Sequence, residues 1–138
     1  MAKLVLDSSA TLAWIYADEI SEATRQVFEA VAEDGAVVPA LWRLEVANSL
    51  TVALRRGRID PEFRRAALAD LARLDITTDT STDTHAWSAI LDFADCFRLT
   101  LYDAAYLELA HRRAVPLATL DNHLRTAGVA LGIRVLGG

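Results

Sequence analysis

Short apolar runs alternate with longer amphipathic stretches along the whole chain. Polar residues or a proline close most of these runs, a pattern typical of buried strands. Capping residues and apolar positions at helical spacing predict the helices between them. The predicted strands are residues 3–7, 36–40, 75–80, 115–121 and 133–136. The predicted helices are residues 9–16, 21–33, 41–56, 60–74, 81–94, 101–113 and 122–126.

Strands that alternate with helices predict a parallel sheet with helices on both faces, which is an α/β fold of the three-layer α/β/α sandwich type. The chain has 138 residues, the usual length of one domain, and no linker, repeat or low-complexity tract divides it. We therefore expect a single domain over residues 1–138. In the helix 41–56, apolar residues recur at helical spacing, as on the core-facing side of an amphipathic helix; they are Leu44, Ala47, Leu50 and Leu54.

Composition excludes several classes of protein. No stretch approaches the ~18 consecutive apolar residues of a membrane span. The apolar N-terminus ends at Asp7, too early for a signal peptide. The single cysteine, Cys96, has no partner within the chain, which fits a reducing compartment. We expect a cytoplasmic protein with no membrane segment.

The net charge of −5 argues against a protein that binds nucleic acid through overall charge. The basic residues are unevenly distributed, however, with five arginines between Arg55 and Arg65. Arginine binds phosphate through its planar fork. The cluster is either a solvated helical face or a set of phosphate contacts, with Arg55 and Arg56 as candidates for binding RNA.

Two aspartates follow predicted strands and precede predicted helices, namely Asp7 and Asp121. Each has a simple interpretation as a helix N-cap. In an open parallel sheet, however, ligands bind beyond the carboxyl ends of the strands. If the two strands are neighbours, the carboxylates lie close together, and such a pair is costly unless a proton or a cation is shared. A divalent metal satisfies this requirement.

Two helical carboxylates add to this picture. Asp103 matches a capping box with Thr100, but it also shares a helical face with apolar residues such as Tyr106. Glu45 lies in helix 41–56, one turn before Asn48. Oxygen ligands of this kind suit Mg²⁺, with Mn²⁺ as a substitute. The three histidines and Cys96 show no zinc-ligand spacing.

At these residues the sequence resembles the PIN-domain nucleases, specifically the VapC-type toxins of toxin–antitoxin pairs. Four segments resemble family motifs in order along the chain: VLDSSA with Asp7, PALWRLEVANSLTVALRRGRI with Glu45 and Asn48, LTLYDAAYLELAHRR with Asp103, and PLATLDNHLRTAG with Thr119 and Asp121. One departure is Ala114, where relatives often have a glycine after the helix. This substitution disfavours a left-handed cap there.

The resemblance implies a PIN-like sandwich, a homodimer, a neutralising antitoxin that places a basic side chain into the acidic pocket, and endoribonuclease activity on a specific RNA, often transfer or ribosomal RNA. As a mechanistic hypothesis, Asp7 and Asp103 hold the principal Mg²⁺, and Glu45 and Asp121 add ligands. A metal-activated water then cleaves the phosphodiester. Ser8, Asn48 and Thr119 are candidates for orienting ligands or waters.

Two other interpretations remain open. Phosphoaspartate proteins also use acidic residues at strand ends, but they need a lysine late in the chain, and the only lysine here is Lys3. The second alternative is a non-catalytic interaction module whose acidic pocket receives the basic tail of an antitoxin. Metal-dependent cleavage distinguishes this module from a nuclease.

Overall fold

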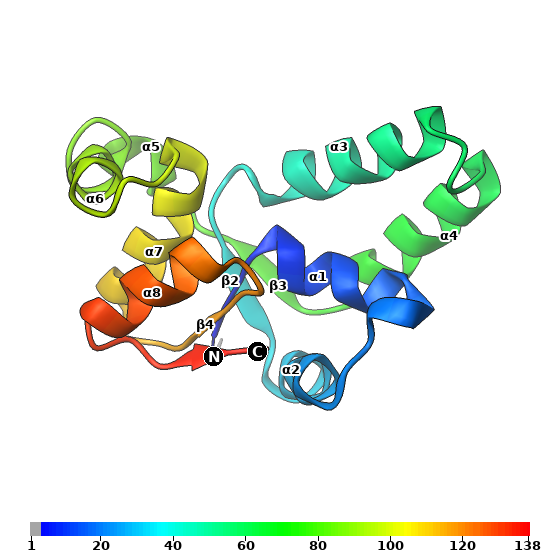
Figure 1. The fold of residues 1–138 in the computed structure, drawn as a ribbon, viewed down its shortest axis with the longest axis horizontal. Coiled ribbons are helices and arrows are strands. Elements are labelled where there is room, and N and C mark those ends of the chain that lie inside the picture. The colour runs from blue at the N-terminus through cyan, green and yellow to red at the C-terminus, as the bar shows by residue number, and fades with distance from the viewer. Residues whose placement is uncertain (1–3) are drawn as a thin grey trace.

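A five-stranded parallel sheet forms the centre of the computed structural model, which describes residues 4–138 (Figure 1). The strands are β1 Val5–Leu6, β2 Ala36–Val38, β3 Ile76–Thr78, β4 Leu117–Ala118 and β5 Val135–Leu136. The α-helices are α1 Ser8–Ile15, α2 Glu22–Asp34, α3 Trp42–Arg55, α4 Pro61–Ala72, α5 Thr82–His85, α6 Ala89–Phe97, α7 Leu101–Arg113 and α8 Asn122–Ala130, with a short 3-10 helix, η1, at Ala17–Glu19. The predicted α/β class is confirmed.

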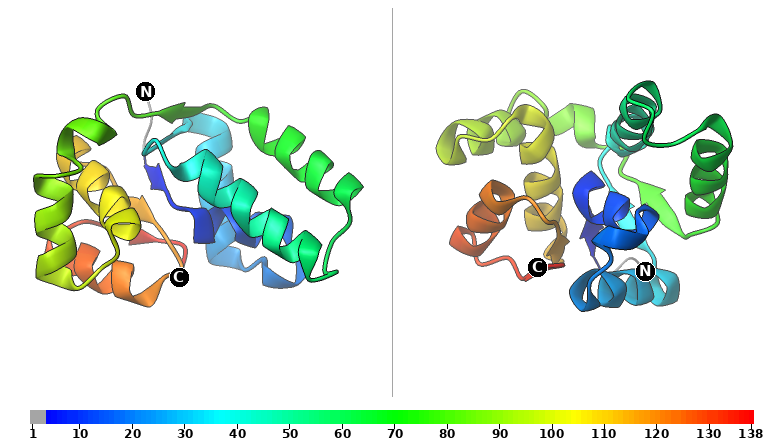
Figure 2. Two further views of the ribbon diagram at one scale, coloured as in Figure 1. Left: turned by 90° about the horizontal axis from the view of Figure 1, so that it is seen from above. Right: turned by 45° about the vertical axis from the view of Figure 1, so that its right-hand side comes forward.

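The strand order is β3-β2-β1-β4-β5. The chain therefore moves outward from β1 in one direction, through β2 and β3, and then returns to add β4 and β5 on the other side. Because crossovers between parallel strands are right-handed, this reversal places the two sets of helices on opposite faces of the sheet. Helices α1, α2 and α4 lie on one side, and α6, α7 and α8 lie on the other (Figure 2).

The strands are short but almost entirely apolar, as a sheet covered on both faces requires. Leu4, Val5 and Leu6 are fully buried, and the side chains of β2 and β4 are buried with them. Tyr106, Leu107 and other residues of α7 pack against this layer, so α7 is the most deeply buried helix of the fold.

Helix starts follow the local capping rules. Ser21 forms a capping box with Thr24 at the start of α2, and Asp60 accepts a hydrogen bond from the Phe63 amide before Pro61 opens α4. An N-cap of this kind contributes about 1 kcal/mol. These helices begin where the sequence predicts, because a cap depends only on residues within one turn.

The predicted core face of α3 is wrong in part. Trp42, Val46, Leu50 and Ala53 are the buried residues of this helix, whereas Leu44 is 75% exposed and Ala47 and Leu54 are only partly buried. Trp42 takes over the first core position and donates a hydrogen bond to the buried Thr11 hydroxyl. The helix is apolar on more than one side, so spacing alone did not identify the side that faces the sheet.

Two helices also differ from their predicted extents. The single helix expected over residues 81–94 is broken between α5 and α6, and Trp87 at the break is 91% exposed. The short helix expected at residues 122–126 continues to Ala130. Its extension brings Gly128 against β5, where an added Cβ would lie 2.9 Å from Val135 Cγ2.

At the end of α7, Ala114 adopts the left-handed cap that the sequence analysis disfavoured for a residue other than glycine. Ala114 has φ 54° and ψ 46°, and its amide bonds the carbonyls of Ala110 and His111. This conformation costs an L-residue roughly 1–2 kcal/mol. Tertiary packing of α7 outweighs that cost.

Within residues 4–138, no helix combines the length and the apolar character that crossing a membrane requires.

Candidate functional site

Asp7 and Asp121 lie at the carboxyl ends of β1 and β4, which are adjacent strands. Both aspartates are also N-caps, as their simple interpretation predicts. Asp7 Oδ1 accepts a hydrogen bond from the Ala10 amide at 2.9 Å, and Asp121 Oδ1 accepts one from the Leu124 amide at 2.9 Å. The order of the strands reverses here, because the chain adds β2 and β3 on one side of β1 and then returns to place β4 on the other side, and ligands bind at such a point in open α/β sheets.

Two hydroxyl groups connect the two strand ends. The Thr119 hydroxyl donates to Asp7 Oδ2 and accepts from the Asp121 amide at 3.0 Å. The Ser9 hydroxyl donates to Asp7 Oδ1 at 2.7 Å and accepts from the Leu120 amide at 2.9 Å. The Asp7 carboxylate is therefore held on both oxygens by donors from β1–α1 and from the segment after β4.

Burial has the largest effect on the pKa of Asp7, which is only 4% exposed. Desolvation raises its pKa to about 6, against the lowering effect of hydrogen bonds from Ala10, Thr119 and Ser9. The negative charge of Asp103 raises the pKa further. Keeping this carboxylate ionised at neutral pH therefore costs free energy in the absence of a cation.

We predict that Asp7→Asn stabilises the metal-free protein above pH 6. Because the folded-state pKa lies above its model value of 3.8, Asp7 supports folding fully below about pH 4 and loses that contribution as pH rises through about 6. The full difference is about 3 kcal/mol. Urea unfolding in EDTA, compared at acidic and neutral pH, measures it. Asp95→Asn on the exposed surface of α6 is the control for charge loss, and a pH-independent difference for Asp7→Asn would contradict the prediction.

Glu45 on α3 meets the site through Tyr106 on α7. The Tyr106 hydroxyl donates to Glu45 Oε1 at 2.6 Å, and Tyr106 is 1% exposed. Desolvation raises the pKa of Glu45, hydrogen bonding by Tyr106 and Ser8 lowers it, and the charge of Asp103 raises it. The net effect is a raised pKa. A buried phenol therefore holds a half-buried carboxylate whose pKa also responds to the charge of Asp103.

Removal of this phenol tests its positioning role. We predict that Tyr106→Phe lowers the free energy of unfolding by about 1–2 kcal/mol, because a hydrogen bond to a charged group is removed. If Glu45 takes part in metal binding, Mg²⁺ affinity falls about 10- to 100-fold. Mg²⁺ titration followed by calorimetry measures this, with Tyr102→Phe on the exposed side of the same helix as the control. Unchanged Mg²⁺ affinity would remove Tyr106 from the site.

Asp103 lies in the first turn of α7, where its amide donates to the Thr100 hydroxyl at 3.1 Å. This is the cap that the sequence predicts. The carboxylate itself is half-buried, and its pKa is raised first by desolvation and then by the negative charge of Asp121. Hydrogen bonding by Thr100 and the positive charge of His123 act in the opposite direction.

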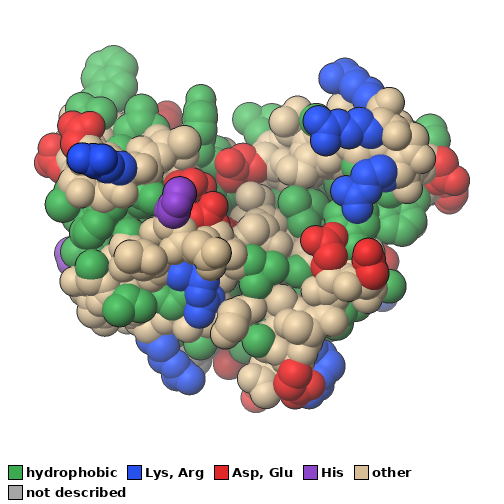
Figure 3. Space-filling view, in the orientation of Figure 1, with side chains coloured by type: hydrophobic (Ala, Val, Ile, Leu, Met, Phe, Trp, Pro, Cys, Tyr) green, Lys and Arg blue, Asp and Glu red, His purple; other side chains and the backbone are tan. Residues whose placement is uncertain are grey.

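The four carboxylates thus form one electrostatically coupled group, with Asp103 in the middle. Figure 3 shows acidic side chains gathered in the hollow between the α7–α8 side of the molecule and the α3 side, with a histidine at its edge. Within residues 4–138, none of the four has an Arg, Lys or His ion-pair partner. As the side chains stand, no three acidic, His or Cys groups in this range are close enough to form a metal site.

The other predicted residues are distributed unevenly. Hydrogen bonding by the Ser8 side chain lowers the pKa of Glu45, and the Thr119 hydroxyl donates to Asp7. Asn48 is exposed and lines a separate hollow with Arg56, while Arg55 is exposed at the end of α3. Three contributing residues were not predicted: Ser9, Tyr106 and His123. Ser9 had a local signal, because a serine two residues after a capping aspartate can bond its carboxylate; the other two depend on contacts between distant segments.

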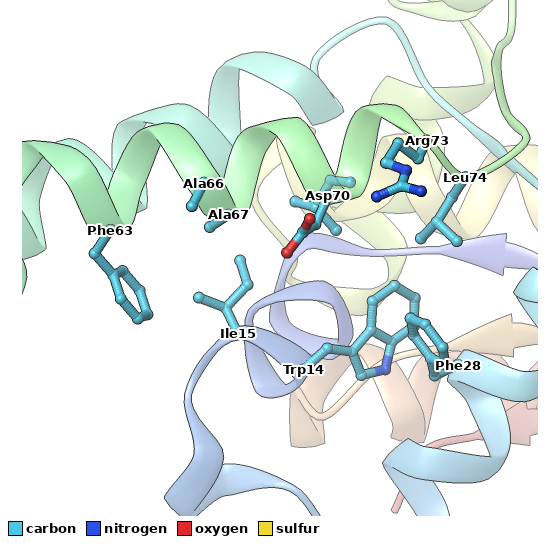
Figure 4. Close-up of a pocket in the computed structure, with 10 residues that line it drawn as sticks. Trp14, Ile15, Phe28, Phe63, Ala66, Ala67, Asp70, Arg73 and Leu74 are labelled. Atoms are coloured by element: carbon cyan, nitrogen blue, oxygen red, sulfur yellow. The ribbon is translucent and has the colours of Figure 1, made fainter.

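A separate hollow lies away from the carboxylates. Its volume is about 440 Å³, and α1, α2 and α4 line it with apolar side chains (Figure 4). Trp14 and Phe28 meet there edge to face, with ring centroids 5.2 Å apart, and the Trp14 indole donates to the Thr24 carbonyl at 3.0 Å. Asp70 and Arg73 are its charged lining residues, and neither belongs to the acidic group.

Comparisons with known proteins agree with this fold. The crystal structure of PAE2754 from Pyrobaculum aerophilum has a similar fold, with a TM-score of 0.64 and 23% sequence identity over 91% of this chain and 86% of that chain. No curated protein sequence matches this one significantly. Residues 4–129, most of the chain, match the PIN domain. The chain therefore belongs to the PIN domain family.

Proposed function

We propose that this protein is a Mg²⁺-dependent endoribonuclease that acts as the toxin of a toxin–antitoxin pair and cleaves a specific RNA. PIN domains are generally metal-dependent nucleases that act on RNA, which supports the enzyme class. The toxin role rests on the resemblance of four motifs to the VapC-type toxins. The same resemblance implies an antitoxin partner and a homodimer.

The observation that carries the proposal is the group of four carboxylates at the carboxyl edge of β1 and β4. Burial and mutual repulsion raise the pKa values of Asp7, Glu45 and Asp103. Structural carboxylates in proteins are normally paired with cationic side chains when buried. Several unpaired ones in a single hollow are typical of a site that receives an external cation.

The donor chemistry fits a hard divalent cation, because all four side chains offer carboxylate oxygens. Asp7 and Asp103 would hold the ion, with Glu45 and Asp121 as further donors. Mg²⁺, or Mn²⁺ in its place, lowers the pKa of bound water and neutralises charge on a phosphate.

The remaining residues of the site act on these donors. Thr119 and Ser9 hold both oxygens of Asp7, so its orientation is set before any ligand arrives. Tyr106 fixes Glu45 in the same way. The Asp121 side chain also caps α8 by accepting a hydrogen bond from the Leu124 amide, which fixes its position at the start of that helix. Such preorganisation is what cleavage of a phosphodiester requires of the protein.

A second function has an observation in its favour. Because no three metal-binding side chains within residues 4–138 already converge, the acidic hollow also suits a non-catalytic module that binds the basic tail of an antitoxin. In that case the carboxylates would pair with arginine or lysine side chains of the partner and no RNA would be cleaved.

Cleavage of RNA distinguishes the two functions. Purified protein, freed of any partner, is incubated with total bacterial RNA in Mg²⁺, Mn²⁺ or EDTA, and new 5′ ends are mapped by sequencing. We expect discrete ends that require metal and are absent with Asp7→Ala. Thermal unfolding with and without Mg²⁺ runs in parallel, because an ion that binds only the folded state raises the melting temperature.

The two readouts together give a definite result. Metal-dependent cleavage that needs Asp7 establishes the nuclease and identifies its target. Absence of RNA cleavage with every metal, whether or not Mg²⁺ stabilises the protein, supports the binding module. If Mg²⁺ neither stabilises the protein nor supports cleavage, the metal site itself is contradicted.

A further inference from the structure

Two arginines line a hollow beside the acidic group. The hollow lies between α1 and α3 and has a volume of about 350 Å³. Arg56 and Arg58 supply its positive charge, and Asn48 and Ser49 supply neutral polar groups. Within residues 4–138, no acidic side chain forms an ion pair with either arginine. The two guanidinium groups are therefore available to an external anion.

The other arginines of the Arg55–Arg65 cluster have different surroundings. Arg64 donates to the Thr51 hydroxyl at 3.2 Å, and Arg65 is paired with Glu62 on the same helix. Arg55 is exposed and does not line the hollow. The cluster is thus not one uniform basic face. Only Arg56 and Arg58 contribute to the hollow next to the carboxylates.

Arg58 is held in place before any ligand binds. Its guanidinium lies over the Tyr16 ring, 5.0 Å from the centroid, and Phe63 stacks on Tyr16 with centroids 6.4 Å apart. The backbone is fixed as well, because Gly57 has φ +74° and forms a Schellman turn in which the Arg58 amide bonds the Ala53 carbonyl at 2.9 Å. An arginine ordered in this way loses less entropy when it binds phosphate.

On both α3 and α1, residues at helical spacing lead from the acidic group to the hollow. On α3, Glu45 is followed at helical spacing by Ser49, Val52 and Arg56, and on α1 Ser8 is followed by Leu12. Arg56 lies eleven positions after Glu45, which is roughly 16 Å along the helix axis. Figure 3 shows basic side chains over the α3–α4 end, on the same face as the acidic hollow.

We infer that the hollow between α1 and α3 binds a backbone phosphate of single-stranded RNA through Arg56 and Arg58, at a distance from the phosphate that lies at the carboxylates. The inference rests on the proposed function. A linear polyanion that crosses the acidic group needs positive contacts further along its path, since the protein as a whole is negative. Glu19 also lines the hollow and opposes the anion, which limits the affinity.

Fluorescence anisotropy with a labelled single-stranded oligoribonucleotide of mixed sequence tests this, in EDTA so that no cleavage occurs. We expect the double variant Arg56→Ala/Arg58→Ala to bind about tenfold more weakly or worse. The slope of log affinity against log salt should fall by about 0.7 for each phosphate that the variant no longer binds. Glu19→Gln should bind several times more tightly, because it removes the opposing charge.

Arg25→Ala controls for the loss of positive charge outside the hollow. It removes one charge, where the double variant removes two, and Arg25 lies on α2, paired with Glu22 and Glu29. Arg58→Lys keeps the charge without the planar stack on Tyr16, and we expect it to retain the salt slope while losing part of the affinity. It serves as the second variant if the double variant unfolds. The inference would be overturned if the Arg56→Ala/Arg58→Ala variant had the same RNA affinity and salt slope as Arg25→Ala. It would also be overturned if the parent protein did not bind the probe at low salt.

Failure of the inference and failure of the proposed function give different patterns. If the parent protein cleaves RNA in Mg²⁺ but the arginine variants bind RNA normally, the phosphate site is wrong and the nuclease stands. If the parent binds RNA through Arg56 and Arg58 but never cleaves it, the phosphate site stands and the nuclease fails.

Discussion

Asp103→Asn is expected to reduce metal-dependent RNA cleavage by roughly 10³-fold while leaving the fold intact. The substitution keeps the shape of the side chain but removes a charge from the centre of the carboxylate group. Asp103 interacts electrostatically with Asp7, Glu45 and Asp121, so no other single change disturbs as many of these couplings. The cap at Thr100 is preserved, because the Asp103 backbone amide makes that bond.

Stability should not fall with this loss of activity. Burial and the charge of Asp121 already hold the Asp103 pKa above its ordinary value, so ionisation works against folding in the absence of metal. Cleavage of the RNA identified by end mapping is measured beside thermal unfolding, and Asp92→Asn on α6 is the control for charge loss. A well-folded Asp103→Asn protein with parental cleavage would remove Asp103 from the mechanism.

Asp79→Ala is expected to lower the free energy of unfolding by about 3–5 kcal/mol, because it breaks a buried ion network. Asp79 follows β3, and only 2% of its side chain is exposed. Arg112 donates to both of its oxygens, at 3.2 and 2.8 Å, and also bonds Glu108. Arg113 adds a contact at 3.3 Å. The network fastens the C-terminal half of α7 to the end of β3.

The pH dependence of this network has a definite sign. Burial raises the pKa of Asp79, but hydrogen bonds from Arg112 and Arg113 outweigh it, and the pKa lies below its ordinary value. A lowered folded-state pKa contributes stability above the unfolded value, about pH 4, and that contribution is lost as pH falls further. Urea unfolding at neutral pH and near pH 3 measures both effects.

Asp83→Ala, an exposed position on α5, is the matched control for removal of an aspartate in this region. We expect the difference between Asp79→Ala and the parent protein to shrink at the lower pH. A loss of less than about 1 kcal/mol at neutral pH, the value of an exposed ion pair, would contradict the structural role assigned to the network.

Asp79 also shows why the candidate site was only partly readable from sequence. Like Asp7 and Asp121, it follows a short strand. Its strand lies at the edge of the sheet, however, two strands from β1, and arginines from α7 neutralise it there. The three aspartates have the same local pattern and differ only in what the fold places beside them.

Local sequence specified those features that depend on residues within one or two turns of each other. The N-caps at Asp7, Ser21 and Asp60 belong to this class, because each depends on hydrogen bonds to the backbone within one turn. The strands and the α/β class belong to it as well, because they follow from the short-range pattern of apolar and polar positions. The four candidate acidic positions were likewise predicted from local motifs.

Tertiary packing, by contrast, specified which polar groups meet and which helix faces are buried. Thr119 bonds Asp7 across 112 positions of the chain, and Tyr106 bonds Glu45 across 61. The rotation of α3 that exposes Leu44, the break at Trp87 and the pairing of Asp79 with Arg112 are of the same kind. Their physical reason is that burial and charge pairing depend on neighbours in space, which strand order and helix packing supply and local spacing does not specify.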